Sequence, residues 1–178
     1  MGDNDVSWEF TMLDGFSMVL GAAIASVHLR MAQLQPRSAL GWVFLIALLG
    51  GLSLTATGPF LYLSRRFLAR PSLGYPQFGD RLWTLWGCPW IISALVTAVF
   101  PSEPHSGRVD PVYVGTLGLG LFLASSVAIP ILAARYIWAD FGLTRRPPGM
   151  RWSWSDRVGL ALTATWPIQV GVGLFLMG

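Results

Sequence analysis

The amino-acid sequence predicts an all-α integral membrane protein, a bundle of five transmembrane helices in a single domain over residues 1–178. Hydrophobic residues make up 53% of the chain and charged residues only 12%, whereas about a quarter of the residues are charged in a soluble domain. Four stretches contain no Asp, Glu, Lys, Arg or His, and they cover residues 38–64, 82–102, 111–134 and 158–178. Each stretch is longer than the roughly 20 residues that a helix needs to cross a bilayer. The composition therefore excludes an ordinary soluble domain.

The first apolar segment, residues 15–27, is shorter than the others, and polar residues lie at both of its ends. Asp14 precedes it, where a negative charge suits the positive end of the helix dipole. His28 and Arg30 follow it, where cations suit the negative end of the dipole and long side chains reach the headgroups. We therefore predict a first transmembrane helix over residues 15–33. In the alternative arrangement this helix lies on the membrane surface, and the bundle has four spans.

A residue of a type that caps helices precedes every apolar segment. Asp and Ser side chains accept hydrogen bonds from the unpaired N–H groups of the first helical turn, and Pro is tolerated at the first helical position. The capping candidates are Asp14, Ser38, Asp80, Asp110 before Pro111, and Ser155 with Asp156. Together with the hydropathy, they predict the other four helices over residues 39–64, 81–101, 111–137 and 157–177.

All twelve basic residues are arginines, and they are divided unequally between the two sides of a five-helix chain. One side holds nine of them, namely Arg65, Arg66, Arg70, Arg81, Arg135, Arg145, Arg146, Arg151 and Arg157. The other side holds three, namely Arg30, Arg37 and Arg108. Because arginine is enriched in cytoplasmic loops, we predict that the N-terminus is cytoplasmic and that the C-terminus lies outside.

The second and third helices and the fourth and fifth helices share an order of features. The first hairpin contains Pro59, Arg65 and Arg66, Asp80 with Arg81, and Pro89-Trp90-Ile91, and the second contains Pro130, Arg135, Asp156 with Arg157, and Trp166-Pro167-Ile168. This order is consistent with one helix followed by two parallel-repeated hairpins, an arrangement that places a site between the repeats in some transporters. Alternatively, the capping and charge rules alone make two such hairpins look alike.

Small residues recur every four positions in the fourth and fifth helices. The first ridge is Gly120, Ala124 and Ala128, and the second is Gly159, Thr163, Pro167 and Gly171. Such ridges let helix backbones approach closely in a membrane, where lipid provides no hydrophobic drive for helices to associate. We expect both ridges to pack against a helix of this chain or of another chain.

His28 is the main candidate for chemistry inside the membrane. Asp14, Met18, Gly21, Ala25 and His28 recur at helical spacing and share one face of the first helix, and its two polar ends lie about 21 Å apart. If this face points into the bundle, His28 is placed to ligate a haem or chlorin metal or to relay protons. In the alternative interpretation, Asp14 caps the helix and His28 lies at the membrane interface.

No complete catalytic or cofactor motif occurs in the sequence. We find no Ser-His-Asp grouping, no His-Glu-x-x-His motif and no Gly-rich phosphate loop. Cys88 is the only cysteine, which excludes a disulfide within the chain and a cysteine-ligated metal cluster. We therefore assign no catalytic residue and no metal site, no motif requires a cofactor, and an enzyme is the less favoured class.

The expected function is that of an accessory, assembly or scaffold subunit of a larger membrane complex in a bacterial inner membrane. The expected partners are other membrane subunits or a second copy, together with anionic lipid headgroups at Arg65, Arg66, Arg145 and Arg146. No nucleic-acid partner is expected, because the arginines do not form a water-facing basic module. The alternatives are a small carrier or channel that forms its pathway as an oligomer, and a membrane redox or enzyme subunit that uses His28.

Overall fold

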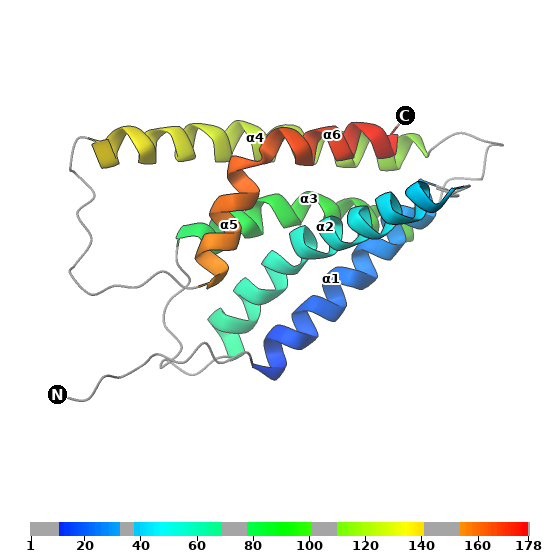
Figure 1. The fold of residues 1–178 in the computed structure, drawn as a ribbon, viewed down its shortest axis with the longest axis horizontal. Coiled ribbons are helices and arrows are strands. Elements are labelled where there is room, and N and C mark those ends of the chain that lie inside the picture. Colours follow the sequence, from blue (N-terminus) through cyan, green and yellow to red (C-terminus); the bar gives the residue numbers. More distant parts are fainter. Residues whose placement is uncertain (1–10, 33–37, 69–77, 101–109, 141–153, 178) are drawn as a thin grey trace.

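The structure, a computed structural model, describes residues 11–32, 38–68, 78–100, 110–140 and 154–177. These residues form six α-helices and one short π-helix (Figure 1). In chain order they are α1 (Met12–Met31), α2 (Ala39–Leu63), the π-helix η1 (Ser64–Leu68), α3 (Phe78–Val99), α4 (Pro111–Asp140), α5 (Trp154–Ala164) and α6 (Trp166–Met177). The predicted all-α membrane bundle is confirmed.

Four helices, α1 to α4, are each long and apolar enough to cross a membrane. The first segment, for which a surface position was the alternative, qualifies as a span of 20 residues and packs along α2. Helices α5 and α6 pass the same test only when they are taken together. The described part of the chain therefore has four spans, or five if the bent pair α5–α6 counts as one.

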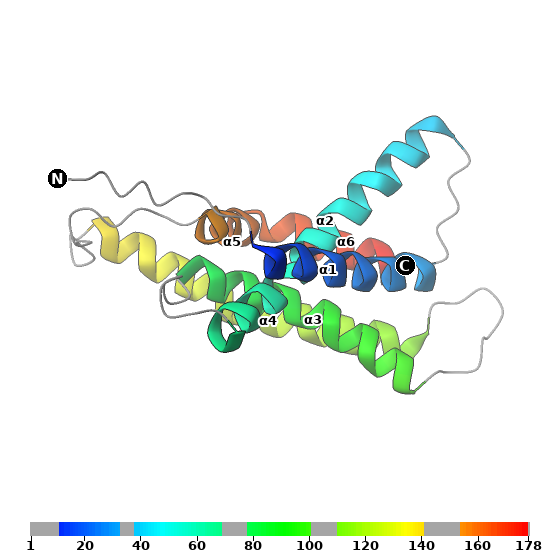
Figure 2. The same cartoon turned by 90° about the horizontal axis from the view of Figure 1, so that it is seen from below.

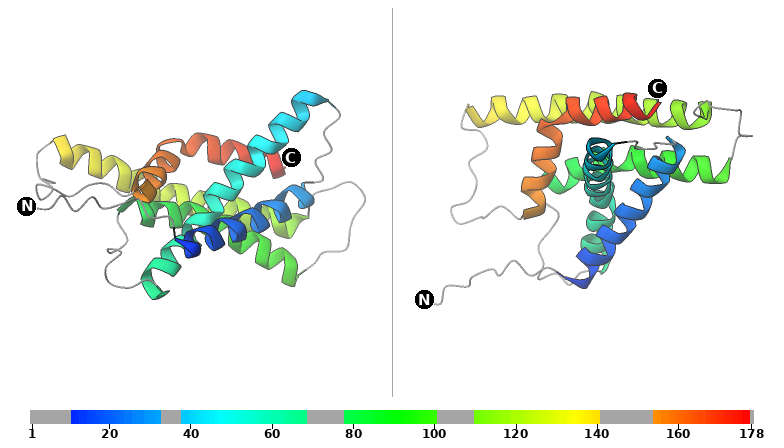
Figure 3. Two further views of the ribbon diagram at one scale, coloured as in Figure 1. Left: turned by 60° about the horizontal axis from the view of Figure 1, so that its bottom comes forward. Right: turned by 45° about the vertical axis from the view of Figure 1, so that its right-hand side comes forward.

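The predicted helix over residues 157–177 is broken into α5 and α6, which meet at an angle of 65°. Thr165 lies between the two helices, and Pro167 follows in the first turn of α6. Proline has no N–H group to donate to the carbonyl four residues earlier, here that of Thr163, and its ring collides with that carbonyl. In consequence α5 crosses the direction of α3 and α4, whereas α6 runs beside α4 (Figures 1 and 3).

Helix α3 lies at the centre of the bundle and packs against α2, α4 and α5. Half of its most apolar stretch, 50%, is buried, compared with 22% for α2 and for α4. Two glycines permit these contacts: a Cβ atom on Gly87 would collide with Pro59 of α2, and one on Gly120 would press against Pro89 of α3. Close approach at small residues is the usual way in which membrane helices pack.

The first predicted ridge of small residues packs inside the chain. Ala124 and Ala128 of α4 are buried in the core with α3 residues, and Gly120 contacts Pro89. The second predicted ridge is not continuous. Gly159 and Thr163 are buried on α5, but Gly171 is exposed on α6 with open space around it, because the chain bends between them.

Among the described residues, two of the five predicted caps bond to the first turn of their own helix as expected. Ser38 accepts from the Gly41 N–H group at 3.1 Å, and Asp110 accepts from the Val112 N–H group at 2.8 Å. The other three helices begin earlier than predicted, at Met12, Phe78 and Trp154. Their acidic residues therefore lie inside the first turn, where they contact other parts of the bundle.

Candidate functional site

Two aspartates from two helix starts pair with a single arginine at one end of the bundle, and a third aspartate lies beside the serine that this arginine bonds to. Asp14 lies in the first turn of α1, Asp80 in that of α3 and Asp156 in that of α5, and all three are buried. The arginine is Arg65 of η1. We call Arg65, Asp14, Asp80, Ser155 and Asp156 the Arg65 cluster.

The Arg65 guanidinium connects three helices. Its Nη2 atom lies 3.6 Å from Oδ1 of Asp14, and its Nη1 atom lies 3.8 Å from Oδ1 of Asp80. Nη1 also donates to Oγ of Ser155 at 2.5 Å, and the guanidinium carbon lies 5.6 Å from the centre of the Trp154 ring. Buried carboxylates need a counter-charge, and Arg65 provides it for Asp14 and Asp80, which belong to helices that are distant in the sequence.

Asp14 is part of a capping box and does not occupy the cap position itself. Thr11 is the N-cap of α1; its side chain accepts from the Asp14 N–H group, while the Asp14 carboxylate accepts from the Thr11 N–H group at 3.0 Å. This arrangement fixes the carboxylate at the positive end of the helix dipole. Asp14 therefore takes part in capping the helix, as predicted, but it is the third residue of the helix, and Thr11 is the N-cap.

Asp156 caps a neighbouring helix. Its Oδ1 atom accepts from the Gly79 N–H group, in the first turn of α3. The two helix starts touch backbone to backbone, because a Cβ atom on Gly79 would collide with the Asp156 carbonyl and one on Gly159 would collide with the Gly79 carbonyl. Sequence reasoning identified Gly159 as a packing residue but missed Gly79, whose only signal is its place directly before the Asp80-Arg81 pair.

His28 forms a second polar site, inside the bundle. Its side chain is fully buried, Nδ1 lies 2.9 Å from the Tyr113 hydroxyl of α4, and Nε2 lies 2.8 Å from the Trp90 carbonyl oxygen of α3. A carbonyl oxygen only accepts, so Nε2 carries the hydrogen and Nδ1 of the neutral ring accepts from Tyr113. We call His28, Trp90 and Tyr113 the His28 site.

Asp14 and His28 share the buried face of α1, as the sequence pattern indicated. The buried residues of this helix are Asp14, Ser17, Gly21, Ala25 and His28. Both ring nitrogens of His28 already bond to protein atoms, so ligation of a haem or chlorin metal would require Tyr113 or Trp90 to move away. The cofactor role of His28 stays a prediction, and Tyr113, its partner, was not identified from the sequence.

The arginines predicted to bind lipid headgroups have different surroundings. Arg65 is engaged in its cluster, with a side chain only 18% exposed, and its contact with lipid headgroups stays a prediction. Arg66 is exposed, and it donates to the Tyr62 hydroxyl at 3.0 Å. Arg145 and Arg146 lie outside the described residues.

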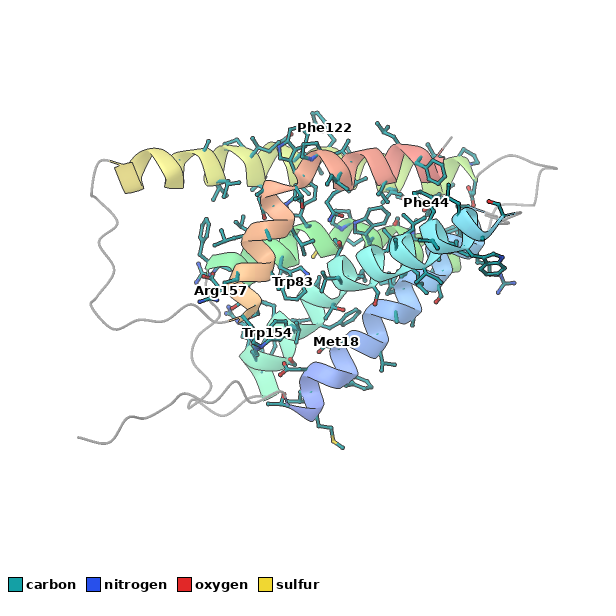
Figure 4. All side chains as sticks on the ribbon, viewed as in Figure 1. Met18, Phe44, Trp83, Phe122, Trp154 and Arg157 are labelled. Atoms are coloured by element: carbon teal, nitrogen blue, oxygen red, sulfur yellow. The ribbon has the colours of Figure 1, made fainter. Side chains whose placement is uncertain are left out.

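Buried tryptophans of α3 lie beside both sites. Trp83, Trp86 and Trp90 are all buried, and Trp83 meets Trp154 of α5 edge to face with ring centres 5.9 Å apart (Figure 4). At the other end, the Trp90 ring stands perpendicular to the His28 ring at 5.0 Å.

Within the described ranges, no group of three or more His, Cys, Asp or Glu side chains is placed to hold a metal ion. No protein family, curated protein or solved structure matches the chain.

Proposed function

We propose that the protein is an accessory or scaffold subunit of a larger membrane complex, and that α2 packs against a transmembrane helix of a partner subunit. The observation that carries this proposal is a pair of exposed glycines, Gly50 and Gly51, in the middle of α2. A Cβ atom on either residue would meet nothing within 4 Å.

Glycine in a helix interior destabilises the helix by about 1 kcal/mol relative to alanine. The well-packed glycines of the bundle, such as Gly21 and Gly87, allow a close contact within the chain. Gly50 and Gly51 make no such contact, so their presence is not explained by packing within the chain. Close approach of a partner helix would explain it, because glycine is the residue that brings membrane helices together.

The first half of α2 supports the same proposal. It diverges from the rest of the bundle (Figure 2), and large side chains such as Leu40, Val43 and Ile46 are exposed along it. Helix α6 reaches it through Phe44 and Phe175, whose ring centres are 5.5 Å apart.

The polar interior also favours a structural role over a transport role. Arg65 and His28 bond to groups of this chain, whereas the ionisable residues of a transport pathway face a substrate or an ion. We further propose a bacterial inner-membrane location with the N-terminus in the cytoplasm. The orientation is supported by the division of the arginines in the sequence, with nine on the side predicted to be cytoplasmic and three on the other.

The test is co-purification from the native membrane with the variant Gly50→Leu/Gly51→Leu. Leucine favours the helix, and its Cβ atom would meet nothing within 4 Å at these positions, so the bundle should fold normally. The control is Gly115→Leu on α4, at another exposed glycine with open space around it. We expect a stoichiometric membrane partner with the parent and the control, and its loss with the double variant.

A partner recovered equally with all three proteins would show that α2 is not the binding face. A protein that purifies without any partner and moves a solute across liposomes by itself would contradict the subunit proposal. That result would favour the carrier.

A further inference from the structure

Two buried tryptophans of α3 have indole N–H groups that bond to nothing in the bundle. Trp86 and Trp90 are fully buried, and in the part of the chain that the structure describes theirs are the two buried side-chain donors without an acceptor. Trp83, three residues before Trp86, is also buried, but its N–H group donates to the Leu54 carbonyl oxygen of α2 at 2.8 Å. The fold therefore satisfies one indole of this helix and leaves the next two unsatisfied.

These two donors are costly where they lie. A buried donor without an acceptor destabilises a protein, and the hydrocarbon core of a membrane offers no water to replace the missing acceptor. Phenylalanine would fill most of the same volume without an N–H group, so packing alone does not explain a tryptophan at either position. A ligand that brings its own acceptor would explain both.

The spacing of the two indoles suits a single ligand. Trp86 and Trp90 are four residues apart, so they lie on the same face of α3 with Cβ atoms about 5–6 Å apart. An indole N–H group only donates, whereas a carbonyl oxygen has two lone pairs and only accepts. One carbonyl group therefore has the acceptor capacity that both tryptophans need.

The surroundings of the two indoles restrict the ligand to a neutral, apolar molecule. The core around them is formed mainly by aliphatic side chains of α1, α2 and α4, such as Ala25, Leu52 and Leu121. Among the described residues, the buried charged side chains all belong to the Arg65 cluster at the bundle end, and a charge inside a membrane is expensive without a partner. Apolar walls with a few polar groups are typical of small-molecule sites.

Helix α6 covers this part of the core. A Cβ atom on Gly87, which lies between the two tryptophans in the sequence, would collide with the Thr55 carbonyl oxygen of α2. The Thr55 hydroxyl in turn donates to Gln169 of α6 at 3.2 Å. Trp166 and Val170 of α6 pack against the same core and are partly exposed. A ligand dissolved in the lipid therefore meets this core at α6.

We infer that Trp86 and Trp90 bind the carbonyl oxygen of a neutral, lipid-soluble ligand that enters the core beside α6. A membrane contains two sources of this chemistry, namely quinones and the ester carbonyls of phospholipids. The site is independent of the packing of α2 against a partner, since Gly50 and Gly51 lie outside this core.

The experiment is an NMR titration of the delipidated full-length protein, labelled with nitrogen-15 at tryptophan, in dodecyl maltoside, a detergent without carbonyl groups. The single variants Trp86→Phe and Trp90→Phe assign the two indole signals. The probes are decylubiquinone, a diacyl phosphatidylcholine and its dialkyl ether analogue, which has no carbonyl groups. We expect one carbonyl probe to shift both signals downfield in a saturable way, while the Trp83 signal and the ether lipid titration show no change.

The probe that shifts the signals identifies the source of the carbonyl group. If neither carbonyl probe shifts them, or if the ether lipid shifts them equally, the inference is wrong. Signals that already lie at the hydrogen-bonded position before any probe is added would also overturn it, because a water molecule or a protein group would then satisfy the two donors.

The double variant Trp86→Phe/Trp90→Phe separates binding from folding. It removes two unsatisfied donors and keeps aromatic rings, so its melting temperature should equal or exceed that of the parent. We expect it to bind the probe about tenfold more weakly, because two hydrogen bonds are lost. The affinity is measured from the rise in melting temperature with probe concentration.

Trp42→Phe is the matched control, since Trp42 is exposed on α2, and its affinity should equal that of the parent. Equal affinity of the double variant and the parent would show that the indole donors do not bind the probe. If the double variant does not fold, the shifts of the two indole signals in the parent decide the question.

Discussion

The Arg65 cluster and the His28 site both bind α1 to the rest of the bundle, but they do so with different chemistry. The cluster lies at the bundle end, carries charges, and is held by ion pairs of 3.6 and 3.8 Å around a side chain that is 18% exposed. The His28 site lies in the interior, is fully buried, and is held by two hydrogen bonds of 2.9 and 2.8 Å between groups of a neutral ring. Charges are expensive inside a membrane, so this fold keeps them at its end and uses neutral polar groups within.

The largest expected effect is at the backbone contact that supports the Arg65 cluster. Gly159→Leu places a side chain where the Gly79 carbonyl of α3 lies, so α3 and α5 must separate and the Asp156 cap must be lost. We expect a loss of about 4 kcal/mol or more in the free energy of unfolding, measured by denaturant titration in mixed micelles. Gly171→Leu is the matched control, since that glycine has open space around it. Equal stability of the two variants would show that the α3–α5 contact does not form.

Arg65→Ala leaves Asp14 and Asp80 without their cation. Breaking a buried pair is strongly destabilising, but partial exposure reduces the effect, so we expect a loss of about 2 kcal/mol. Arg66→Ala, at the exposed neighbour, should change stability by less than about 0.5 kcal/mol. High salt should lower the melting temperature of the parent more than that of Arg65→Ala. If salt lowers the melting temperatures of the parent and of Arg65→Ala equally, charges do not hold the Arg65 cluster, and the contrast with the neutral His28 site fails.

Tyr113→Phe removes the donor to Nδ1 of His28 and keeps the ring. The expected loss is about 1–2 kcal/mol, because a buried acceptor stays unsatisfied. Unlike that of Arg65→Ala, this loss should not depend on salt, since both partners are neutral. Thermal unfolding at low and high salt, with Tyr62→Phe as the control, measures this difference. A salt-dependent loss at Tyr113 would contradict the neutral hydrogen bond.

The smallest expected effect is at a third polar contact, between α2 and α6. Thr55 donates to the Gln169 side chain at 3.2 Å, and such interhelical bonds contribute about 0.6 kcal/mol on average. Thr55→Val should therefore destabilise the protein by about that amount in the same titration. Thr116→Val, on a hydroxyl that bonds only to carbonyls of its own helix α4, is the control. A loss as large as that of Tyr113→Phe would mean that α6 is held mainly through Gln169.

Local patterns predicted the spans well, because hydropathy and length depend on nearby residues alone. The same patterns did not predict where a proline breaks a helix. Pro89 and Pro130 lie inside continuous helices, whereas α5 and α6 separate next to Pro167. Pro89 is buried and close to Gly120 of α4, while Pro167 is exposed on α6. Whether a proline bends a membrane helix therefore depends on neighbours that the linear pattern does not reveal.

For the same reason, the sequence predicted only some of the residues of the candidate sites. Asp14 and His28 were recognisable as polar residues on one face, because helical spacing is local. Their partners Arg65 and Tyr113 lie 51 and 85 residues away in sequence, and no local rule selects them. The capping rules identified Asp80 and Asp156 as residues of helix starts, but only the tertiary structure shows that Asp156 bonds to another helix.

The cap of α3 by Asp156 also has a consequence for biosynthesis. The Gly79 N–H group leaves the ribosome 77 residues before the carboxylate that accepts from it. Asp14 likewise precedes Arg65, and Arg65 precedes Ser155 by 90 residues. The cluster thus becomes complete only when α5 has been made, so a chain truncated before α5 leaves the Gly79 N–H group and the Arg65 guanidinium without the partners that α5 provides. A membrane protease would meet an incomplete bundle there, and the start of α5 completes it in the finished chain.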